Sequence, residues 1–431
     1  MIVSIIYLLL IFVLLVSFNL TNKICLFIGL LPFHEFLKKC IETFTGTAGV
    51  YPLWRELSII LILISTYKGY RKKTPNMALL SLIVIYVLLM FYIGYDVDSS
   101  AATSIIRLYT MCFMLYVACT RIDSITLDYE KIVKTLFIVV LIISITGVIE
   151  RFAIYSTYHV FMDHYELNRN GELVFKMPSY TIMGDIPRMC GFVNGPNQFG
   201  VTISMLLSLL IFIYLNFKHN LPSIKCLFVI TLGVICLLLS FSRAGWFILI
   251  CSILGYLHLQ GKHVLNIVFN IVFLLTIILL IGYMILPESI EVILQSVTGK
   301  EASAATRQGM ITDAYNTLIT DPFGHGLGSG RIDGGTFTES AHLIVVYEIG
   351  IQGLIIFLLF YFINILKISR KKTNKFSCLL VPLLIFSVIS GFVSVNFDEA
   401  PFMLYFWFLM GVSQNKTLMY NINKRIYQYA K

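Results

Sequence analysis

Repeated apolar runs are the feature that most constrains what this chain can fold into. They recur along most of the sequence, and many have the length of about 17–25 residues that a helix needs to cross roughly 30 Å of hydrocarbon. The runs therefore predict an all-α fold, a polytopic membrane helix bundle that forms one integral membrane domain over residues 1–431. The predicted spans, about twelve or thirteen helices, are 1–20, 24–37, 57–67, 76–95, 102–119, 132–152, 197–217, 226–241, 244–259, 264–286, 342–366, 377–395 and 400–414.

The composition supports this class of protein. Of the 431 residues, 58% are hydrophobic and 13% are charged, whereas a soluble globular protein has roughly 25% charged residues. The chain therefore lacks the polar surface that a water-soluble protein needs. Residues 1–18 contain no basic segment and no small-residue cleavage site, so we interpret them as a retained first helix and not as a signal peptide.

The distribution of basic residues predicts the orientation in the membrane. The net charge is +9, and the lysines and arginines lie in short clusters between the apolar runs, as at 68–73 and 370–372. Basic loops face the cytoplasm, so this pattern predicts a multi-pass protein of the cell inner (cytoplasmic) membrane and argues against nucleic-acid binding. The C-terminal tail is also predicted to be cytoplasmic, because it carries Lys416, Lys424, Arg425 and Lys431.

Two long polar loops then fall on the outer side of the membrane. They cover residues 153–196 and 287–341, and loops of this length commonly carry function. The side of the N-terminus stays open. It lies outside if both 1–20 and 24–37 cross the membrane, and the parity changes if one of them is re-entrant.

The end of the first outer loop has features of an anion site. Pro196 suits the first turn of a helix and Asn194 suits its N-cap. A helix N-terminus attracts anions, and Arg188 would add a guanidinium that can grip a phosphate. Asn194 and Asn197 are therefore candidate substrate-binding residues together with Arg188. The alternative is that Asn-Gly-Pro-Asn is only a turn that begins a helix.

A tight corner around Arg243 separates two apolar runs. An arginine at the centre of a membrane helix costs roughly 2.5–3.5 kcal/mol, and less near an interface. The alternation of spans puts this corner outside, against the positive-inside trend. Arg243 therefore needs a partner, either an acidic side chain or a bound anion.

The second outer loop and the helix after it hold the densest group of candidates. Arg307 precedes a Gly-x-Gly-x-Gly run that includes Gly326 and Gly328; the run permits close approach to a ligand but follows no strand, so it does not indicate a nucleotide fold. His342 lies at the membrane edge, where an imidazole can move a proton or act only as an interfacial anchor. Glu348 lies about 240° further round the helix, so it is not a same-face partner of His342; we expect it buried beside an arginine.

Metal and disulfide chemistry have little support. The nine cysteines show no metal-ligand spacing and are interpreted as small core residues, with a Cys40–Cys190 disulfide as the alternative. Asp96 and Asp98 resemble a DxD metal motif, although two carboxylates at a helix end are more often solvated. The sequence predicts no metal and no cofactor.

Four short motifs occur in order between residues 185 and 366. They are Arg-x-x-Gly-Phe-x-Asn-x-Pro-Asn at 188–197, Ser-Arg-Ala at 242–244, Arg307 followed by Pro-Phe-Gly-x-Gly-x-Gly at 322–328, and Ala-His with Glu-x-Gly-x-x-Gly at 341–353. In this order and on these faces they resemble the O-antigen ligase and O-antigen polymerase superfamily. The N-terminal helices match only in topology, and Leu343 stands where many relatives have Asn.

The resemblance implies a membrane glycosyltransferase that uses undecaprenyl-diphosphate-linked glycan on the periplasmic face, without nucleotide sugar or metal. It implies that Arg188 and Arg307, with Arg243, bind the diphosphate, and that His342 assists the acceptor hydroxyl. This chemistry is physically consistent, because the departing diphosphate gains negative charge that held guanidinium groups stabilise.

Several functions share these motifs. The two substantial outer loops favour an O-antigen polymerase of lipopolysaccharide biosynthesis, with a chain-length regulator protein as an expected partner by resemblance. An O-antigen ligase would instead transfer the glycan to lipid A core, and a capsule or exopolysaccharide polymerase would use equivalent chemistry. A lipid-linked oligosaccharide flippase, which is not an enzyme, and a purely structural membrane subunit are the alternatives from other classes.

Overall fold

The structure is a computed structural model. It describes residues 2–45, 51–67, 74–123, 127–149, 165–167, 173–175, 182–183, 186–193, 195–217, 223–262, 312, 316, 319–330, 340–370, 374–392, 394 and 399–429.

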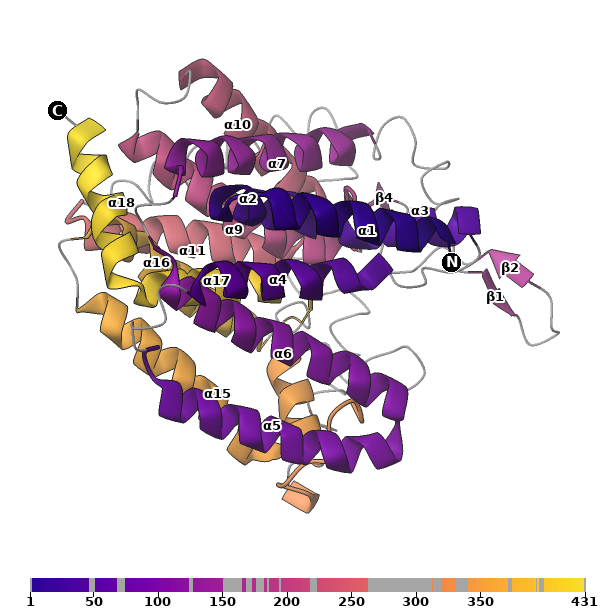
Figure 1. Ribbon diagram of the computed structural model, residues 1–431. Coiled ribbons are helices and arrows are strands. Elements are labelled where there is room, and N and C mark those ends of the chain that lie inside the picture. The colour runs from indigo at the N-terminus through magenta and orange to yellow at the C-terminus, as the bar shows by residue number, and fades with distance from the viewer. Residues whose placement is uncertain are drawn as a thin grey trace. The chain divides into compact units, whose positions relative to one another are not determined.

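Most of the described residues lie in α-helices (Figure 1). The first seven are α1 (Ile2–Ser17), α2 (Leu20–Leu30), α3 (His34–Thr45), α4 (Trp54–Ser65), α5 (Met77–Val97), α6 (Ser99–Arg121) and α7 (Tyr129–Ile149), with short 3-10 turns at Leu31–Phe33 and Tyr51–Leu53. The later ones are α9 (Pro196–Asn216), α10 (Ser223–Leu239), α11 (Arg243–Leu259), α15 (Ala341–Ser369), α16 (Lys375–Ser390), α17 (Phe402–Gln414) and α18 (Lys416–Tyr429).

Five of the described helices are long and apolar enough to cross a membrane, namely α5, α6, α7, α9 and α15. Each coincides with one of the predicted spans. Shorter apolar helices, α1, α10, α11, α16 and α17, match further predicted spans, and the span predicted at 264–286 lies outside the described residues. The prediction of an all-α polytopic membrane helix bundle is confirmed.

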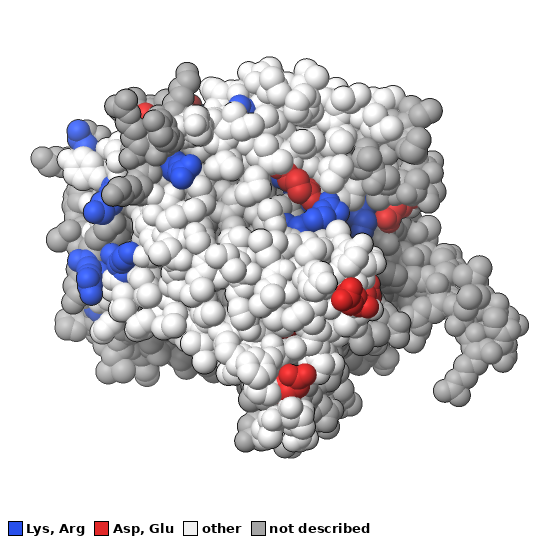
Figure 2. Space-filling model, turned by 60° about the horizontal axis from the view of Figure 1, so that its bottom comes forward, with Lys and Arg blue, Asp and Glu red and all other residues white. Residues whose placement is uncertain are grey.

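The surface of the helices fits a hydrocarbon environment. Large apolar side chains are exposed along them, with exposed fractions of 65% for Ile85, 72% for Tyr92 and 84% for Ile224. Figure 2 shows one face of the molecule, on which uncharged side chains cover a broad area and charged side chains are few. Contiguous apolar surface of this kind is rare on soluble monomers and marks a surface that meets apolar partners.

The chain divides into two compact units. Unit 1 consists of Met1–Ser65, Ile125–Leu249 and Lys424–Lys431, and unit 2 consists of Thr66–Ser124 and Ile250–Asn423. Each unit therefore combines segments that are far apart in the sequence.

In unit 1, helix α9 is the most buried of the five long apolar helices and packs beside α7 and α10 (Figure 1). Its first turns meet the start of α11 so closely that side chains have no room. A Cβ atom at Gly200 would lie 2.1 Å from the Cβ of Ser242, and one at Gly245 would lie 2.6 Å from the carbonyl carbon of Gly200. The hydroxyl of Ser204 donates to the carbonyl oxygens of Gly200 and Gly245 at 2.6 and 2.7 Å. Glycine and small hydroxyl side chains therefore make this crossing.

The N-terminal part of unit 1 contains two short helices in place of one predicted stretch at 24–37. Helix α2 has 11 residues, which corresponds to about 16 Å of helix, less than the hydrocarbon thickness. Helix α3 begins at His34, whose Nδ1 accepts a hydrogen bond from the indole N–H of Trp54 at 2.9 Å. Burial, together with the charges of Arg55 and Lys38, lowers the pKa of His34 to about 2, so this nitrogen keeps the lone pair that accepts the bond.

Two short strand pairs, which the sequence analysis did not predict, lie between α7 and α9. Strand β1 (Tyr165–Leu167) pairs antiparallel with β2 (Leu173–Phe175), and β3 (Ile182–Met183) pairs antiparallel with β4 (Ile186–Pro187). The second pair ends directly before Arg188.

In unit 2, α6 packs along α17, and α5 packs along α6 and α15 (Figure 1). The fully buried indole of Trp407 is surrounded by aromatic rings, with centroids 5.5 Å away for both Phe113 and Phe360. Aromatic pairs at such distances contribute roughly 0.5–1.5 kcal/mol each beyond their buried area. This cluster forms the core of unit 2.

A buried amide network closes one end of unit 2. The side-chain oxygen of Asn364 on α15 accepts from the amide of Asn76 and the hydroxyl of Tyr116, both at 2.9 Å. Its amide donates to the carbonyl of Phe360 at 2.7 Å, and its own carbonyl accepts from the amide of Gln414 at 3.0 Å. We call this the asparagine end of unit 2; it joins α5, α6, α15 and α17.

The structure also bears on two of the open alternatives. All nine cysteines are free, so Cys40 and Cys190 form no disulfide. Asp98 is the N-cap of α6, and its carboxylate accepts from the backbone N–H groups of Ser100 and Ala101 at 2.9 and 3.0 Å. Helix capping explains this carboxylate without a metal.

Candidate functional site

In unit 1, Arg188 lies shortly before the start of α9. Its Nε–H donates to the carbonyl of Ser240 at 3.0 Å, and its Nη2 donates to the side-chain oxygen of Asn197 at 2.6 Å and to the carbonyl of Phe241 at 3.5 Å. These three contacts orient the guanidinium. The half-buried Arg188 thus joins the start of α9 to the corner between α10 and α11.

The start of α9 corrects one detail of the sequence analysis. Pro196 occupies the first turn as predicted, but the N-cap is Gly195, in an extended conformation and without a side-chain capping bond. The prediction that Asn194 is the N-cap is wrong, because the cap is the residue directly before the first helical residue. Asn194 itself lies outside the described residues.

Helix α11 begins beside α9. Ser242 is its N-cap residue: the Ser242 hydroxyl accepts from the backbone N–H of Gly245 at 3.3 Å and donates to the carbonyl of Asn197 at 3.4 Å. The partly exposed Arg243 is the first residue of α11. Two helix N-termini and the side chains of Arg188 and Arg243 therefore belong to one corner of unit 1.

This corner has the electrostatic character of an anion site. Each helix N-terminus contributes about half a positive charge, and guanidinium groups match the geometry of phosphate oxygens. The structure places Arg188 in contact with Asn197 and with the corner that directly precedes Arg243; a joint role of the three residues stays a prediction.

In unit 2, the candidates lie around a break in α15. Gly350 has φ 72° and ψ 173°, which interrupts the helix. The carbonyls of Tyr347, Glu348 and Ile349 accept from the N–H of His325, the N–H of Gly326 and the hydroxyl of Tyr86, at 2.9, 2.9 and 3.0 Å. On the other side of the break, the N–H of Ile351 donates to the carbonyl of Pro322 at 3.1 Å. The break is therefore paired with the loop 321–330, which satisfies backbone groups that would otherwise be costly inside a membrane.

The glycines of this loop are required by backbone packing. Gly324, Gly326 and Gly328 all have positive φ. A Cβ atom on them would lie 2.4 Å from the nitrogen of Gly350, 2.3 Å from the nitrogen of Gly94 and 2.6 Å from the nitrogen of Ala102, respectively. The loop therefore fits between α15 and the ends of α5 and α6. The sequence predicted that Gly326 and Gly328 let a ligand approach closely; in the structure the backbone of α5 and α6 takes that space.

His342 lies in the first turn of α15, which Ser340 caps. The imidazole is 2% exposed, and its Nε2 is 2.8 Å from the carbonyl oxygen of Val388. A carbonyl only accepts, so Nε2 carries a proton and the neutral ring keeps its lone pair on Nδ1. The ring also packs on Phe392 and against Gly391, where a Cβ atom would lie 2.7 Å from Nε2. His342 is thus a buried and oriented imidazole, not an interfacial anchor.

Glu348 lies at the end of the first half of α15 with an exposed fraction of 0%. Its side chain faces the end of the glycine loop, where a Cβ atom at Gly330 would lie 3.5 Å from the carboxylate. The predicted burial of Glu348 is confirmed. Arg307, the expected third cationic residue, lies outside the described residues.

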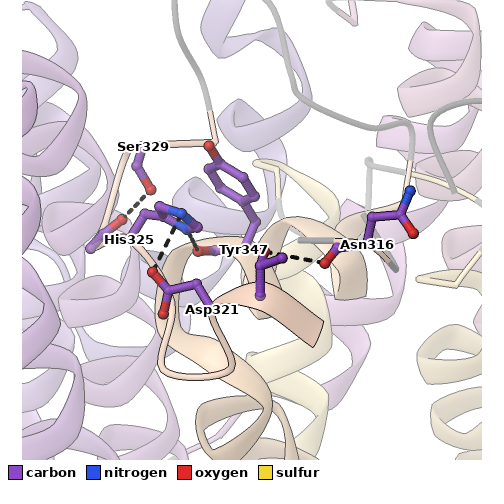
Figure 3. A network of polar contacts seen from close by, with 7 residues as sticks. Asn316, Asp321, His325, Ser329 and Tyr347 are labelled. Atoms are coloured by element: carbon purple, nitrogen blue, oxygen red, sulfur yellow. Dashed lines mark hydrogen bonds and ion pairs between the residues drawn. The ribbon is translucent and has the colours of Figure 1, made fainter. Parts of the chain in front are cut away.

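Sequence reasoning assigned no role to His325, which lies within the glycine run. Its ring stacks on Tyr347 with centroids 4.4 Å apart and planes 13° apart (Figure 3). Its Nε2 is 3.5 Å from the carboxylate of Asp321 and its Nδ1 is 3.3 Å from the carbonyl of Tyr347. The Asp-x-x-x-His spacing could have indicated the contact with Asp321. The contact with the carbonyl of Tyr347 depends on the break at Gly350, which no local sequence pattern indicates.

Within the part of the chain that the structure describes, no three His, Cys, Asp or Glu side chains are grouped so as to hold a metal ion. No protein-family model matches the sequence, and no curated protein matches it.

Proposed function

We propose that the chain is a membrane glycosyltransferase that polymerises undecaprenyl-diphosphate-linked oligosaccharide repeat units on the periplasmic face. The four ordered motifs support the reaction class, and the apolar helices are consistent with a lipid-linked donor. Within this proposal the protein acts in O-antigen synthesis, as part of lipopolysaccharide biosynthesis.

The observation that carries the proposal is the corner of unit 1 at Arg188. Three hydrogen bonds to uncharged oxygens orient the guanidinium at the start of α9, beside the start of α11 that carries Arg243. A diphosphate leaving group gains negative charge as the glycosidic bond breaks. Positive groups that are already oriented stabilise this charge without reorganisation in the transition state.

The proposed role of His342 is to accept the proton of the attacking sugar hydroxyl. Its protonated Nε2 is held by the carbonyl of Val388, which leaves Nδ1 as the basic nitrogen. General-base catalysis of this kind typically contributes 10²- to 10⁴-fold, as an order of magnitude. Glu348, Arg307 and Asn194 remain candidates in the same reaction.

One observation favours a flippase instead. A broken helix with a buried carboxylate, as at Gly350 and Glu348, is a common feature of transporter binding sites. However, the break is paired with the glycine loop of the same chain. The corner at Arg188 suits the diphosphate of a leaving group at least as well as the diphosphate of a transported lipid. We therefore keep polymerisation as the first proposal and the ligase and the flippase as its alternatives.

The proposal is tested in the native host with the variants Arg188→Ala and His342→Ala and with Arg370→Ala as the matched control. Arg370 is exposed and follows α15, so its loss should leave the polysaccharide unchanged. Membrane levels of each variant are checked first. We expect the first two variants to lose the long-chain ladder on a gel and to leave a single repeat unit on lipid A core.

Other patterns identify the alternatives. Free lipid-linked polymer with bare core would show a ligase, and repeat units trapped on the cytoplasmic side would show a flippase. A normal ladder in both variants would contradict the proposed site.

A further inference from the structure

The loop 321–330 and the break in α15 form one backbone unit. Two N–H groups of the loop, at His325 and Gly326, donate to the carbonyls of Tyr347 and Glu348, and the loop carbonyl of Pro322 accepts from Ile351. The first half of α15, which carries His342 and Glu348, therefore takes its direction from this loop.

The side chain of His325 adds a contact of a different kind to this unit. Both of its ring nitrogens face acceptors, the carboxylate of Asp321 at 3.5 Å and the carbonyl of Tyr347 at 3.3 Å (Figure 3). Neither acceptor can donate when Asp321 is ionised, so a neutral imidazole satisfies only one of them. The protonated ring donates to both, and hydrogen bonds from a charged donor are stronger than neutral ones.

The described groups around the loop include few charged side chains. On α15 the ring faces Tyr347, and Glu348 follows it. From α5 and α6 the described contacts to the loop come from Met90, Gly94, Ala101 and Ala102, none of which is charged. Of these groups, Asp321 is the acidic side chain in ion-pair distance of the imidazole.

We propose that His325 is a positioning residue whose protonated ring clamps the glycine loop to the break in α15, so that the placement of His342 and Glu348 depends on pH. Histidine is the side chain that changes charge between about pH 5 and 8. Protonation strengthens the clamp, and deprotonation loosens the loop and the first half of α15 together. The effect on activity rests on the proposed function, whereas the clamp itself does not.

The clamp is tested without substrate, by amide hydrogen exchange of the purified full chain in a lipid nanodisc between pH 5.5 and 8. Exchange is corrected for its intrinsic pH dependence and followed in peptides that contain Gly326 and Ile351. We expect protection of both peptides to fall about fivefold over this range in the wild type, since a hydrogen bond to a charged group contributes more than a neutral one.

Three variants make the result specific. His325→Gln and Asp321→Asn should abolish the pH dependence, and His258→Gln, at an exposed histidine in the last turn of α11, should preserve it. Protection that stays constant with pH in the wild type, or that changes equally in His325→Gln, would overturn the proposal.

An activity profile then separates the two proposals. If the exchange result is as expected and wild-type chain elongation rises with acidity while His325→Gln is flat, the clamp acts on the reaction. If the exchange result is as expected and no variant elongates any lipid-linked glycan, the clamp stands and the proposed function fails.

Discussion

The two ends of unit 2 are closed in different ways. At the asparagine end, four helices are joined by side-chain amides and a phenol around Asn364, which is fully buried. The other end, which we call the glycine end, consists of the loop 321–330 and the break in α15 at Gly350. Here the helices are joined by backbone groups, and glycines stand where a Cβ atom would collide with neighbouring backbone. The first end uses its polar groups to bind the helices to each other. The second brings backbone close to the helix break at Gly350. We therefore expect substitutions at the second end to act through backbone collisions, and substitutions at the first end to act through lost hydrogen bonds.

The largest expected effect is at the glycine end. Gly326→Ala puts a methyl group 2.3 Å from the backbone nitrogen of Gly94, and backbone cannot move away as a side chain can. Positive φ alone costs an alanine about 1–2 kcal/mol, and the collision adds to this. We expect little folded protein in detergent, as measured by yield and thermal unfolding.

Gly261→Ala is the matched control for this substitution. Gly261 also has positive φ, but nothing lies within 4 Å of its Cβ position. It should therefore lose only about 1–2 kcal/mol. Equal losses for the two variants would mean that the close approach of Gly326 and Gly94 is not important for stability.

The next effect is at the asparagine end. Asn364→Leu removes the acceptor for Asn76 and one of the two acceptors of Tyr116, whose hydroxyl also donates to the carbonyl of Pro75 at 3.1 Å. An unsatisfied donor costs about 1–3 kcal/mol. We expect a loss of about 2–4 kcal/mol in the free energy of unfolding, measured by denaturant titration in micelles. The smaller change Tyr116→Phe should cost about 1 kcal/mol. The loss in the free energy of unfolding of the double variant Asn364→Leu/Tyr116→Phe should be smaller than the sum of the two single losses. Full additivity would show that Asn364 and Tyr116 are not coupled.

A small effect is expected where α6 begins. Asp98→Ala removes the N-cap and should cost about 1 kcal/mol, while the neighbouring Asp96→Ala should stay within about 0.5 kcal/mol. Thermal unfolding with and without a chelator compares the capping and metal interpretations. A stability loss caused by the chelator in the wild type but not in Asp98→Ala would restore the metal interpretation.

Much of the fold was predictable because long hydrophobic runs predict membrane-spanning helices from their length alone. The spans predicted at 76–95 and 197–217 correspond to Met77–Val97 and Pro196–Asn216. The helix start at Pro196 followed from local chemistry, because the missing N–H of proline costs nothing there. Burial of Glu348 also followed, since an ionisable group in an apolar helix rarely faces lipid.

Long-range contacts could not be predicted in the same way. The Gly-x-Gly-x-Gly run indicated close approach, but its partners, Gly350 and Gly94 among them, are distant in the sequence. The contact of His325 with the carbonyl of Tyr347 depends on the break at Gly350. Two acceptors of Arg188 are the backbone carbonyls of Ser240 and Phe241, and backbone acceptors cannot be recognised from residue type. The strand pairs between 165 and 187 were missed because very short strands have no detectable periodicity.

The central claim is that the corner at Arg188 stabilises a diphosphate leaving group during chain elongation. The most direct measurement is elongation by the purified chain in lipid vesicles that contain undecaprenyl-diphosphate-linked repeat units, with products followed by mass spectrometry. Arg188→Lys keeps the charge but loses the fork that donates to Ser240 and Asn197, and Arg370→Lys is the control. We predict lipid-linked dimers and longer chains with the wild type and the control, and a drop of about 10²-fold or more with Arg188→Lys in protein that remains folded. No elongation by the folded wild type, or equal elongation by Arg188→Lys, would contradict the account.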